Sequence, residues 1–380
     1  MADKIPFLIN AASGDSLARQ AVISTGRGEI QTPFFMPVGT YGAVKSQAPE
    51  ELQEQGAQVV LSNAYHLYLR PGLDLLERTG GLHGFMGWDG PMLTDSGGYQ
   101  VFSLAALRDV DDDGVTFKSH LDGSVHRFTP EKVIDIQRII GSDFMMPLDE
   151  CPPGDAPKKS WATAVARTTQ WMSRALARFD ETGPAYGKPQ YLLCIIQGGT
   201  DPGLRRQSAE SLLQLEPSGV AIGGLAVGES KEELQATLED LAPQPPADTP
   251  RYLMGVGTPA DLVRAVGLGM DMFDCVLPTR NARNGQLFTS AGKLNLRNAK
   301  FRDDLEPVQD VCGCPLCRRY TRAYLRHLFV TGEVLGLRLA TAHNLWFYHH
   351  MMADMRSAIS SGAFSQWSRE FLGRYEEGLE

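Results

Sequence analysis

The sequence predicts an α/β protein of the (β/α)₈ barrel class, with inserted β-hairpins and a C-terminal helical subdomain. Three observations lead to this prediction. Eight short apolar runs alternate with longer amphipathic segments over the first 280 residues, polar side chains stand where the runs end, and a cluster of cysteines lies in the last third. Repeated strand–helix units of this kind favour a parallel sheet covered by helices.

The composition is that of an ordinary globular protein. The chain has 380 residues, of which 43% are hydrophobic and 21% charged. No stretch approaches the about 20 consecutive apolar residues of a membrane span, and the N-terminus lacks the apolar core of a secretory signal. Three isolated and three clustered cysteines are typical of a metal site in a reducing compartment, so we expect a cytoplasmic protein with no membrane segment.

The strands are predicted from short apolar runs bounded by turn residues. Residues 7–30 are expected to form two or three short strands, with turns at 13–15 and 26–28. The eight runs that follow are residues 34–38, 59–62, 92–94, 144–148, 191–196, 220–222, 252–255 and 272–276. Amphipathic patterns predict helices between most of them, at residues 48–56, 130–140, 158–179, 204–215, 231–241 and 259–266.

A doubly wound sheet is the alternative architecture. It is disfavoured because no GxGxxG motif follows the first strand. Two insertions interrupt the alternation: a hairpin at residues 116–128, with Asp122 and Gly123 in a type I′ turn, and a second hairpin at residues 285–296. Residues 243–250 (PQPPADTP) form a stiff connector, and a helical tail follows residue 318.

Reactive side chains gather at the ends of the predicted strands. They are Asn63, Asp95, Asp149, Gln197, Gly223, Gly224, Met254 and Asp274. The active sites of barrel enzymes form at this face. One such residue could be a helix cap, but three aspartates and a glutamine at equivalent places predict an enzyme.

We interpret residues 269–283, GMDMFDCVLPTRNAR, as the segment around which the chain is organised. Keeping a carboxylate ionised at the end of a buried strand costs free energy, even when it faces a cationic loop. Such a carboxylate therefore indicates a functional role. Asp274 is therefore the candidate nucleophile, and the loop after it is the candidate clamp for a polyanion. The alternative is that Asp274 caps the next element or pairs with Arg280.

Positive charge is concentrated in the last third of the chain. The net charge is −9, yet residues 280–332 contain ten basic and four acidic residues. A basic region on an acidic body predicts a localised phosphate-binding face. The alternative is a solvated surface on which basic residues cluster by chance.

The motif CGCPLC places Cys312, Cys314 and Cys317 in a tight turn, one ligand short of a tetrahedral metal site. The candidate fourth ligands are His327, His343, His349 and His350, and His343 is best placed because it precedes an apolar helix that could return to the cysteines. A closed Cys₃His set leaves no position for water, so the ion would be structural. Zinc is favoured over iron.

Several motifs together resemble the bacterial tRNA-guanine transglycosylases over nearly the full length of the chain. They are TDSGGYQ at 94–100, QGG at 197–199, GGLAVGE at 223–229, YLMGVG at 252–257, residues 271–283, and CxCxxC with a distant histidine. The resemblance implies a zinc-containing barrel that exchanges the wobble guanine of certain tRNA anticodons for 7-aminomethyl-7-deazaguanine (preQ1), the precursor of queuosine.

The resemblance also assigns roles to residues. It implies that Asp274 forms a covalent ribosyl–enzyme intermediate and that Asp95 is the general acid/base. Those implied to bind the base are Asp95, Tyr99, Asp149, Gln197, Gly224, Leu225 and Met254, with Val227 and Cys151 suiting the small preQ1 base. Those implied to bind RNA are Gly255, Arg280, Arg283, Lys293 and Arg297. The implied zinc ligands are Cys312, Cys314, Cys317 and His343.

The family further implies a homodimer through the zinc subdomain. Tyr320, Tyr324, His327 and Phe85 occupy the family's interface aromatic positions, although the family often has Trp in place of Tyr320.

We expect three parts: a catalytic barrel at residues 1–280, a basic hairpin and zinc-binding subdomain at 281–345, and helices at 346–380 that pack on the barrel. Two rivals remain, a non-catalytic RNA-binding subunit and a zinc-dependent barrel hydrolase with Asp274 as a ligand.

Overall fold

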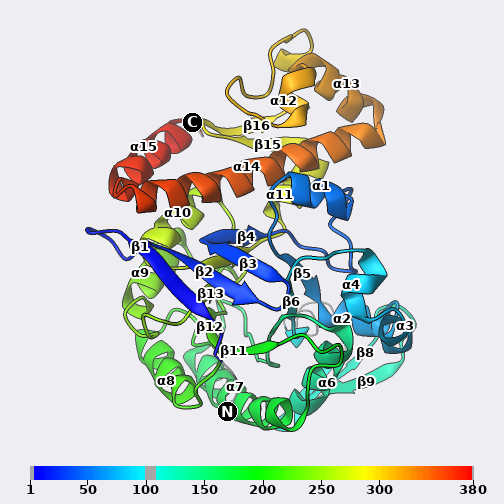
Figure 1. Ribbon diagram of the computed structural model, residues 1–380, viewed down its shortest axis with the longest axis vertical. Helices are drawn as coiled ribbons and strands as arrows, with labels where there is room; N and C mark the ends of the chain where they lie inside the picture. Colours follow the sequence, from blue (N-terminus) through cyan, green and yellow to red (C-terminus); the bar gives the residue numbers. More distant parts are fainter. Residues whose placement is uncertain (1–3, 99–107, 379–380) are drawn as a thin grey trace.

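The structure is a computed structural model that describes residues 4–98 and 108–378. It consists of a barrel of strands and helices, with a C-terminal layer of helices lying across one side (Figure 1). The strands are β1 (Phe7–Ala12), β2 (Arg19–Thr25), β3 (Gly28–Thr32), β4 (Phe34–Met36), β5 (Val60–Asn63), β6 (Met92–Asp95), β7 (Arg108–Asp111), β8 (Gly114–Lys118), β9 (Val125–Phe128), β10 (Phe144–Met145), β11 (Tyr191–Ile196), β12 (Gly219–Ile222), β13 (Arg251–Leu253), β14 (Met272–Asp274), β15 (Gln286–Thr289) and β16 (Gly292–Asn295).

The helices alternate with the barrel strands and then form the C-terminal region. They are α1 (Pro49–Glu54), α2 (Ala64–Leu69), α3 (Leu73–Arg78), α4 (Gly81–Met86), α6 (Pro130–Ile140), α7 (Lys158–Glu181), α8 (Pro202–Leu213), α9 (Lys231–Leu241), α10 (Pro259–Gly267), α11 (Leu277–Arg283), α12 (Pro315–Arg319), α13 (Arg322–Thr331), α14 (Val334–Ser360), α15 (Phe364–Glu377) and the 3₁₀ helix η1 (Ala299–Phe301). None of the helices in the described part of the chain combines the length and apolar character needed to cross a bilayer.

The eight predicted apolar runs all become strands of one parallel sheet. Its order is β4-β14-β13-β12-β11-β10-β6-β5, and the first and last strands meet through a parallel bridge between Val38 and Leu61. The Gly39 N–H donates to the Leu61 carbonyl at 2.6 Å, and the Leu61 N–H donates to Pro37 at 3.1 Å. The sheet is therefore a nearly closed barrel, which confirms the predicted class and rules out the doubly wound alternative.

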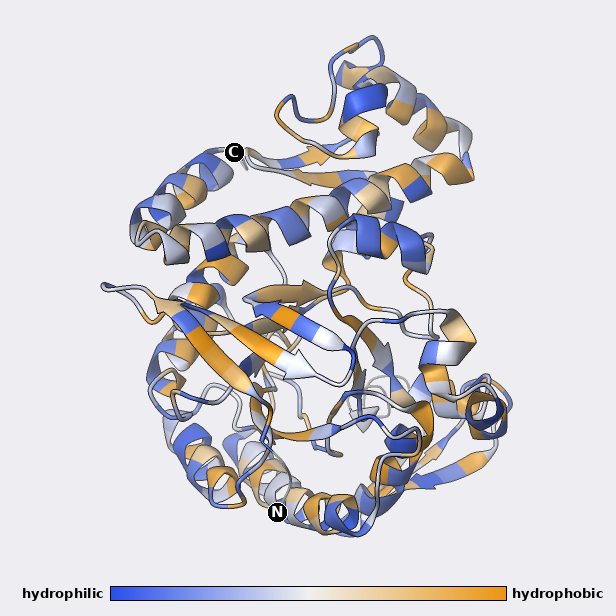
Figure 2. Ribbon diagram, viewed as in Figure 1, coloured by the Kyte–Doolittle hydropathy of each residue, from blue (hydrophilic) through white to orange (hydrophobic). Residues whose placement is uncertain are grey.

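Large apolar side chains fill the barrel, so it is a packed core and not a pore. One cluster of buried residues includes Phe34, Met36, Leu93, Phe144, Leu193, Ile195, Tyr252 and Met272. Further clusters join the outside of the sheet to the surrounding helices. Helices α7 and α8 alternate between hydrophilic and hydrophobic residues in Figure 2, as expected of helices with one buried and one solvent-facing side.

Local sequence signals set the helix ends. Helix α6 begins after Thr129, whose hydroxyl accepts the Lys132 N–H at 3.2 Å, has Pro130 in its first turn and ends at Gly141, where φ is 79°. Helix α9 begins with a reciprocal capping box between Ser230 and Glu233. These positions agree with the predicted spans because capping depends on residues that are adjacent in sequence.

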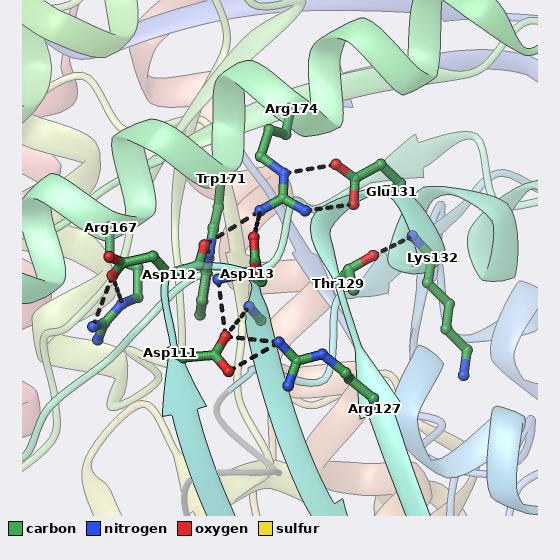
Figure 3. A network of polar contacts seen from close by, with 11 residues as sticks. Asp111, Asp112, Asp113, Arg127, Thr129, Glu131, Lys132, Arg167, Trp171 and Arg174 are labelled. Carbon is green, nitrogen blue, oxygen red and sulfur yellow. Dashed lines mark hydrogen bonds and ion pairs between the residues drawn. The ribbon is translucent and has the colours of Figure 1, made fainter.

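The insertion after β6 forms a three-stranded antiparallel sheet, β7-β8-β9, of which the sequence predicted only the β8–β9 hairpin. Its β7–β8 turn is tied to the barrel helices by arginines (Figure 3). Arg174 of α7 binds Glu131 of α6 at 2.7 Å and Asp113 of the turn at 3.4 Å. Arg167 binds both Asp112 of the turn and Glu150 of the loop after β10, at 3.1 and 2.6 Å. The insertion is thus anchored to the loop that carries Asp149.

The type I′ turn predicted at Asp122 and Gly123 is wrong. The Ser119 N–H donates to the Ser124 carbonyl at 2.8 Å, so the loop between the strands contains four residues, not two. Asp122 lacks the positive φ that a type I′ turn requires. Its carboxylate instead accepts the Ser124 N–H and hydroxyl at 3.1 and 2.7 Å, an aspartate-capped turn that widens the loop.

The C-terminal region confirms the second hairpin, β15–β16, and the helical tail. Helix α14 crosses residue 345, where a domain boundary was expected, and connects the cysteine-rich region to the barrel as one continuous helix. On the barrel side, the Tyr348 hydroxyl donates to the Gly257 carbonyl at 2.6 Å. On the hairpin side, the Asn344 amide donates to the Pro278 and Gln286 carbonyls at 2.9 and 3.1 Å.

A buried ion pair fixes the N-terminal sheet to the bottom of the barrel. Arg19 of β2 contacts both carboxylate oxygens of Asp271, at 3.0 and 2.6 Å, and the Arg251 N–H donates to the same carboxylate at 2.8 Å. The two side chains are 6% and 0% exposed. The pair stabilises the fold only while both partners are present, because burying one of the two charges alone costs free energy.

We expect Arg19→Met to lower the free energy of unfolding by about 3–5 kcal/mol, since it leaves the Asp271 carboxylate buried without its cation. Denaturant unfolding monitored by circular dichroism measures the change. Arg178→Met is the control, because its pair with Asp135 at 2.9 Å lies on the surface and should contribute less than about 1 kcal/mol. Equal losses in the two variants would contradict the prediction.

Candidate active site and metal centre

The C-terminal ends of the barrel strands bring the predicted polar residues into one ring. Asp274 and Asp95 are the last residues of β14 and β6, and Asn63, the last residue of β5, is the register partner of Asp95. Asp149, Gln197, the Gly223–Gly224 pair and Met254 follow β10, β11, β12 and β13. The strands run parallel, so all these ends lie on one face of the barrel, as predicted.

Among the described residues, two donors bind the same carboxylate oxygen of Asp274. Its Oδ1 accepts the Tyr252 hydroxyl at 2.7 Å and the Gly255 N–H at 2.8 Å. Burial raises the pKa of Asp274, and these two hydrogen bonds oppose the rise. The Arg280 side chain is exposed and forms no ion pair with Asp274. The alternative of an Asp274–Arg280 pair is therefore not supported, and Oδ2 is the oxygen not bound by these donors.

Asp95 lies close enough to the other two carboxylates to affect the groups around them. The Asn63 amide donates to its Oδ2 at 3.2 Å. Both Asp274 and Asp95 raise the pKa of the buried Tyr252 hydroxyl, after the larger effect of burial. Asp95 also raises the pKa of Asp149. Three carboxyl groups thus share one site, a condition that sets their proton affinities apart.

Asp149 and Gln197 form the floor of the site. The Gln197 amide donates to the Asp149 carboxylate at 2.7 Å, and both side chains are buried. Burial, and then the negative charge of Asp95, raises the pKa of Asp149 to about 7, with the Gln197 hydrogen bond opposing the rise. A Cβ at Gly98 would lie 2.7 Å from the Asp149 carboxylate. The TDSGG motif therefore keeps glycine there so that the loop can pass close to Asp149.

The loop after β12 is held from two sides. Arg205 of α8, which sequence analysis did not identify, donates to the carbonyls of Gly223 and Gly224 at 2.7 and 3.1 Å. Beyond them, the Glu229 carboxylate accepts the N–H groups of Ala226 and of Val227, the latter at 3.0 Å. No short-range motif points to Arg205, because its partners lie at the end of β11 and in the loops after β11 and β12, not on its own helix.

The remaining predicted residues fall into two groups. Met254 is half-buried beside the site, Leu225 is buried, and Gly255 is exposed next to Asp274. The predicted RNA-binding residues Arg280, Lys293 and Arg297 are exposed and Arg283 is half-buried, on α11 and on or just after the β15–β16 hairpin. Tyr99 lies outside the described residues.

The cysteine motif and His343 form one metal-binding cluster. The His343 Nδ1 lies 3.9, 3.4 and 3.4 Å from the sulfur atoms of Cys312, Cys314 and Cys317, and all four ligand atoms lie within 4.8 Å of one another. Tetrahedral zinc, with bonds of about 2.0–2.3 Å, places its ligand atoms at similar separations. The residues therefore fit a closed Cys₃His site.

A hydrogen bond fixes the histidine in the orientation that binding needs. The Nε2 of His343 lies 2.9 Å from the Phe288 carbonyl, so Nε2 carries the proton and Nδ1 faces the cysteines. Of the other candidates, His327 is exposed, His349 packs against Phe35 and His350 stacks on Trp346. Among residues 4–98 and 108–378 no second group of three metal-binding side chains occurs.

Comparison with known proteins gives the same picture. A family model described as queuine tRNA-ribosyltransferase matches residues 15–377. The chain is 52% identical to the queuine tRNA-ribosyltransferase of Solidesulfovibrio magneticus over 373 residues, covering 98% of this chain and 99% of that protein. It is 51% identical to that of Novosphingobium aromaticivorans over 98% of this chain and 99% of the relative, and 48% identical to that of Zymomonas mobilis over 98% and 96%.

We expect Cys317→Ser to reduce bound transition metal from about one ion per chain to a small fraction of that, because three ligands hold an ion much less tightly than four. Elemental analysis of the purified protein measures the content, and a lower melting temperature should accompany the loss. Cys194→Ala is the control, since Cys194 is buried in β11 and is not part of the cluster. Full metal content in Cys317→Ser would refute this ligand set.

Proposed function

This chain belongs to the queuine tRNA-ribosyltransferase family, and from this premise we propose that it exchanges the wobble guanine of certain tRNA anticodons for preQ1, in queuosine biosynthesis. It is a tRNA-guanine transglycosylase, a pentosyltransferase, and the resemblance predicted from its motifs is confirmed. The observation that carries the proposed mechanism is the ring of Asp95, Asp149 and Asp274 at the ends of parallel barrel strands, with Oδ1 of Asp274 held by two donors.

Asp274 is the nucleophile. Its Oδ2 attacks C1′ of the ribose, the glycosidic bond breaks, and the bonding electrons leave with guanine. The incoming base then attacks C1′ and releases the carboxylate, so two inversions retain the anomeric configuration. The Tyr252 hydroxyl and Gly255 N–H support this role because they orient Oδ1 and leave Oδ2 toward the site.

Asp95 is the general acid/base. It gives a proton to the leaving guanine and takes one from the entering base, so the enzyme ends each cycle in its starting protonation state. Its hydrogen bond from Asn63 and its closeness to Tyr252 and Asp149 fit this position. Both catalytic carboxylates are present, which separates this chain from a non-catalytic RNA-binding subunit.

The base is read on its edges by Asp149, Gln197 and the loop after β12. Asp149 accepts N–H groups of the guanine Watson–Crick edge, while Gln197 and the Gly224 N–H contact O6. The Ala226 N–H binds Glu229, so the Leu225 carbonyl, on the opposite side of the same trans peptide, is free to accept the aminomethyl group of preQ1. Met254 and Tyr99 contact the faces of the ring, and the small Val227 and Cys151 leave room for preQ1.

The tRNA lies over the basic region. We assign Gly255, Arg280 and Arg283 to nucleotides that flank the wobble guanine. Lys293 and Arg297 contact phosphates, because exposed cations on a hairpin suit a polyanion better than base edges. Most of the binding energy for the RNA should therefore depend on salt concentration.

Zinc is the ion proposed for the Cys₃His cluster. Three thiolates and one imidazole with no open position favour a structural zinc. Bound there, it would fix the cysteine turn to α14 and take no part in the base exchange. Thiolate ligands also favour a reducing compartment, and we place the enzyme in the cytoplasm. The three-part division at residues 280 and 345 remains a proposal.

A homodimer is proposed through the aromatic residues on α13, just before it, and on α4. The Tyr320 and Tyr324 rings stack with centroids 5.4 Å apart, and Tyr324 and Phe85 are 39% and 38% exposed. Exposed aromatic side chains with His327 nearby suit the core of an interface. Because Tyr is smaller than Trp, we expect a weaker dimer than in relatives with Trp in place of Tyr320.

We predict that Asp274→Asn abolishes base exchange while leaving tRNA affinity within about tenfold of the unchanged protein. The amide cannot form the ribosyl ester, whereas the basic surface is untouched. Incorporation of labelled guanine or preQ1 into unmodified tRNA measures exchange, and filter binding measures affinity. A tRNA without the wobble guanine is the control substrate. Full exchange by the variant would refute Asp274 as nucleophile, and none by the unchanged protein would refute the reaction.

The next prediction concerns the pH dependence of preQ1 binding. Asp149 must be ionised to accept from the base, and its pKa is raised to about 7, so protonation below that pH competes with binding. We expect the dissociation constant of preQ1 to rise about tenfold as pH falls from 8 to 6. Asp149→Asn should bind weakly without this dependence. Titration calorimetry checks both, and a constant affinity from pH 8 to 6 in the unchanged protein would contradict the assignment.

The last prediction of this subsection tests the proposed dimer interface. Tyr324→Arg introduces a charge into the proposed aromatic interface and should shift the protein from dimer to monomer in sedimentation velocity. Leu8→Arg on β1, an exposed apolar position away from α13, is the control and should sediment like the unchanged protein. A dimer in the Tyr324 variant would place the interface elsewhere.

A further inference from the structure

A buried arginine underlies the base-reading loop and has no assigned role. Arg205 of α8 is 0% exposed. Its guanidinium donates to four backbone carbonyls: Gly199 at 2.7 Å, Ile196 at 2.8 Å, Gly223 at 2.7 Å and Gly224 at 3.1 Å. The Ile196 carbonyl is at the end of β11 and the Gly199 carbonyl is in the loop after it. The Gly223 and Gly224 carbonyls are in the loop after β12. One side chain therefore ties together the two loops that carry Gln197 and Gly224.

Because the peptide bond is planar, the contact between Arg205 and the Gly223 carbonyl also fixes the direction of the Gly224 N–H. A trans peptide holds its C=O and N–H in opposite directions. Because the Gly223 carbonyl points to Arg205 beneath the loop, the Gly224 N–H of the same peptide must point the other way. The Cys151 thiol marks that side: burial raises its pKa, and a hydrogen bond from the Gly224 backbone opposes the rise. Gln197 is also close, because its Oε1 would lie 2.3 Å from a Cβ at Gly224.

We infer that Arg205 is the positioning residue that aims the Gly224 N–H at O6 of the base. The inference rests on the proposed function and assigns a determinant of purine selectivity to a side chain that never touches the base. The positive φ of Gly224, 65°, is part of the same arrangement. Glycine adopts it without strain, and the two carbonyl contacts of Arg205 hold it in place.

Only arginine can fill this role. Its planar fork supplies five donors in fixed directions, four of which are used here, whereas a lysine ammonium offers one small centre that cannot reach carbonyls on both loops. Arg205 takes part in none of the ion pairs formed by the described residues. Its positive charge is therefore stabilised by carbonyl dipoles. Burial of an unpaired charge costs free energy, so the arrangement indicates that these carbonyls need to be held in place.

The test compares two ligands on Arg205→Lys. One is preQ1, and the other is its 6-deoxy analogue, which lacks O6. If Arg205 aims the Gly224 N–H, the variant should bind preQ1 about five- to tenfold more weakly, the effect of one misplaced hydrogen bond, and the analogue less than twofold more weakly. Other losses, including that of the N1–H contact in the analogue, occur in both proteins and cancel in the comparison. Competition binding measures the four dissociation constants.

Arg138→Lys is the matched control. Arg138 is also a buried arginine that binds carbonyls, those of Phe179 and Thr182 at 2.9 and 2.7 Å, but it joins α6 to the end of α7 away from the base. It should lower the melting temperature without changing the ratio between the two ligands. A general loosening of the fold would instead weaken both ligands equally in either variant.

The outcomes separate the inference from the proposed function. Equal weakening of preQ1 and its analogue in Arg205→Lys, or no weakening of either, would overturn the role of Arg205. If that variant does not fold, Arg205→Gln repeats the comparison, and failure of both to fold would show a requirement for the barrel as a whole and likewise overturn it. Absence of preQ1 binding by the unchanged protein would instead refute the proposed function.

Discussion

Closure of the parallel sheet is the constraint on which the rest of the structure depends. The hydrogen bonds between Gly39, Pro37 and Leu61 join the first strand of the barrel to the second, after the other six have completed the circle. A closed parallel sheet has one C-terminal rim, so residues separated by 179 positions, such as Asp95 and Asp274, are forced into one site. Neither residue could find the other through local structure alone.

Closure also creates the electrostatic problem that the site exploits. Three carboxyl groups at one rim cannot all be ionised cheaply in a buried place. Asp274 receives a hydroxyl and a backbone N–H, whereas Asp149 and Asp95 receive side-chain amides from Gln197 and Asn63. At the opposite end of the barrel Asp271 is fully paired with Arg19. Asp271 is thus a carboxylate that stabilises the fold, whereas Oδ2 of Asp274 is not bound by the donors that hold Oδ1.

The C-terminal region is joined to the barrel by one long helix. Helix α14 carries His343 toward the cysteines, Asn344 toward the hairpin and α11, and Tyr348 toward the Gly257 carbonyl. Because α11 begins three residues after Asp274, the same helix connects the metal cluster, the basic hairpin and the strand that ends in Asp274. A change at the cluster should therefore reach the basic hairpin and α11 before it reaches Asp274.

The sequence by itself determined the barrel class, the eight strands, most helix spans and the polar residues at the strand ends, because periodicity, capping and turn chemistry act between neighbours in the chain. It also determined the cysteine ligands, which lie within six residues, and the family. Tertiary structure decided what depends on contacts distant in sequence: that His343 completes the cluster, that Tyr252 and Gly255 orient Asp274, and that Arg205 holds two loops. The Asp122 turn differed from the prediction because its side chain bonded to Ser124 and widened the loop, a choice between two local solutions that sequence pattern does not resolve.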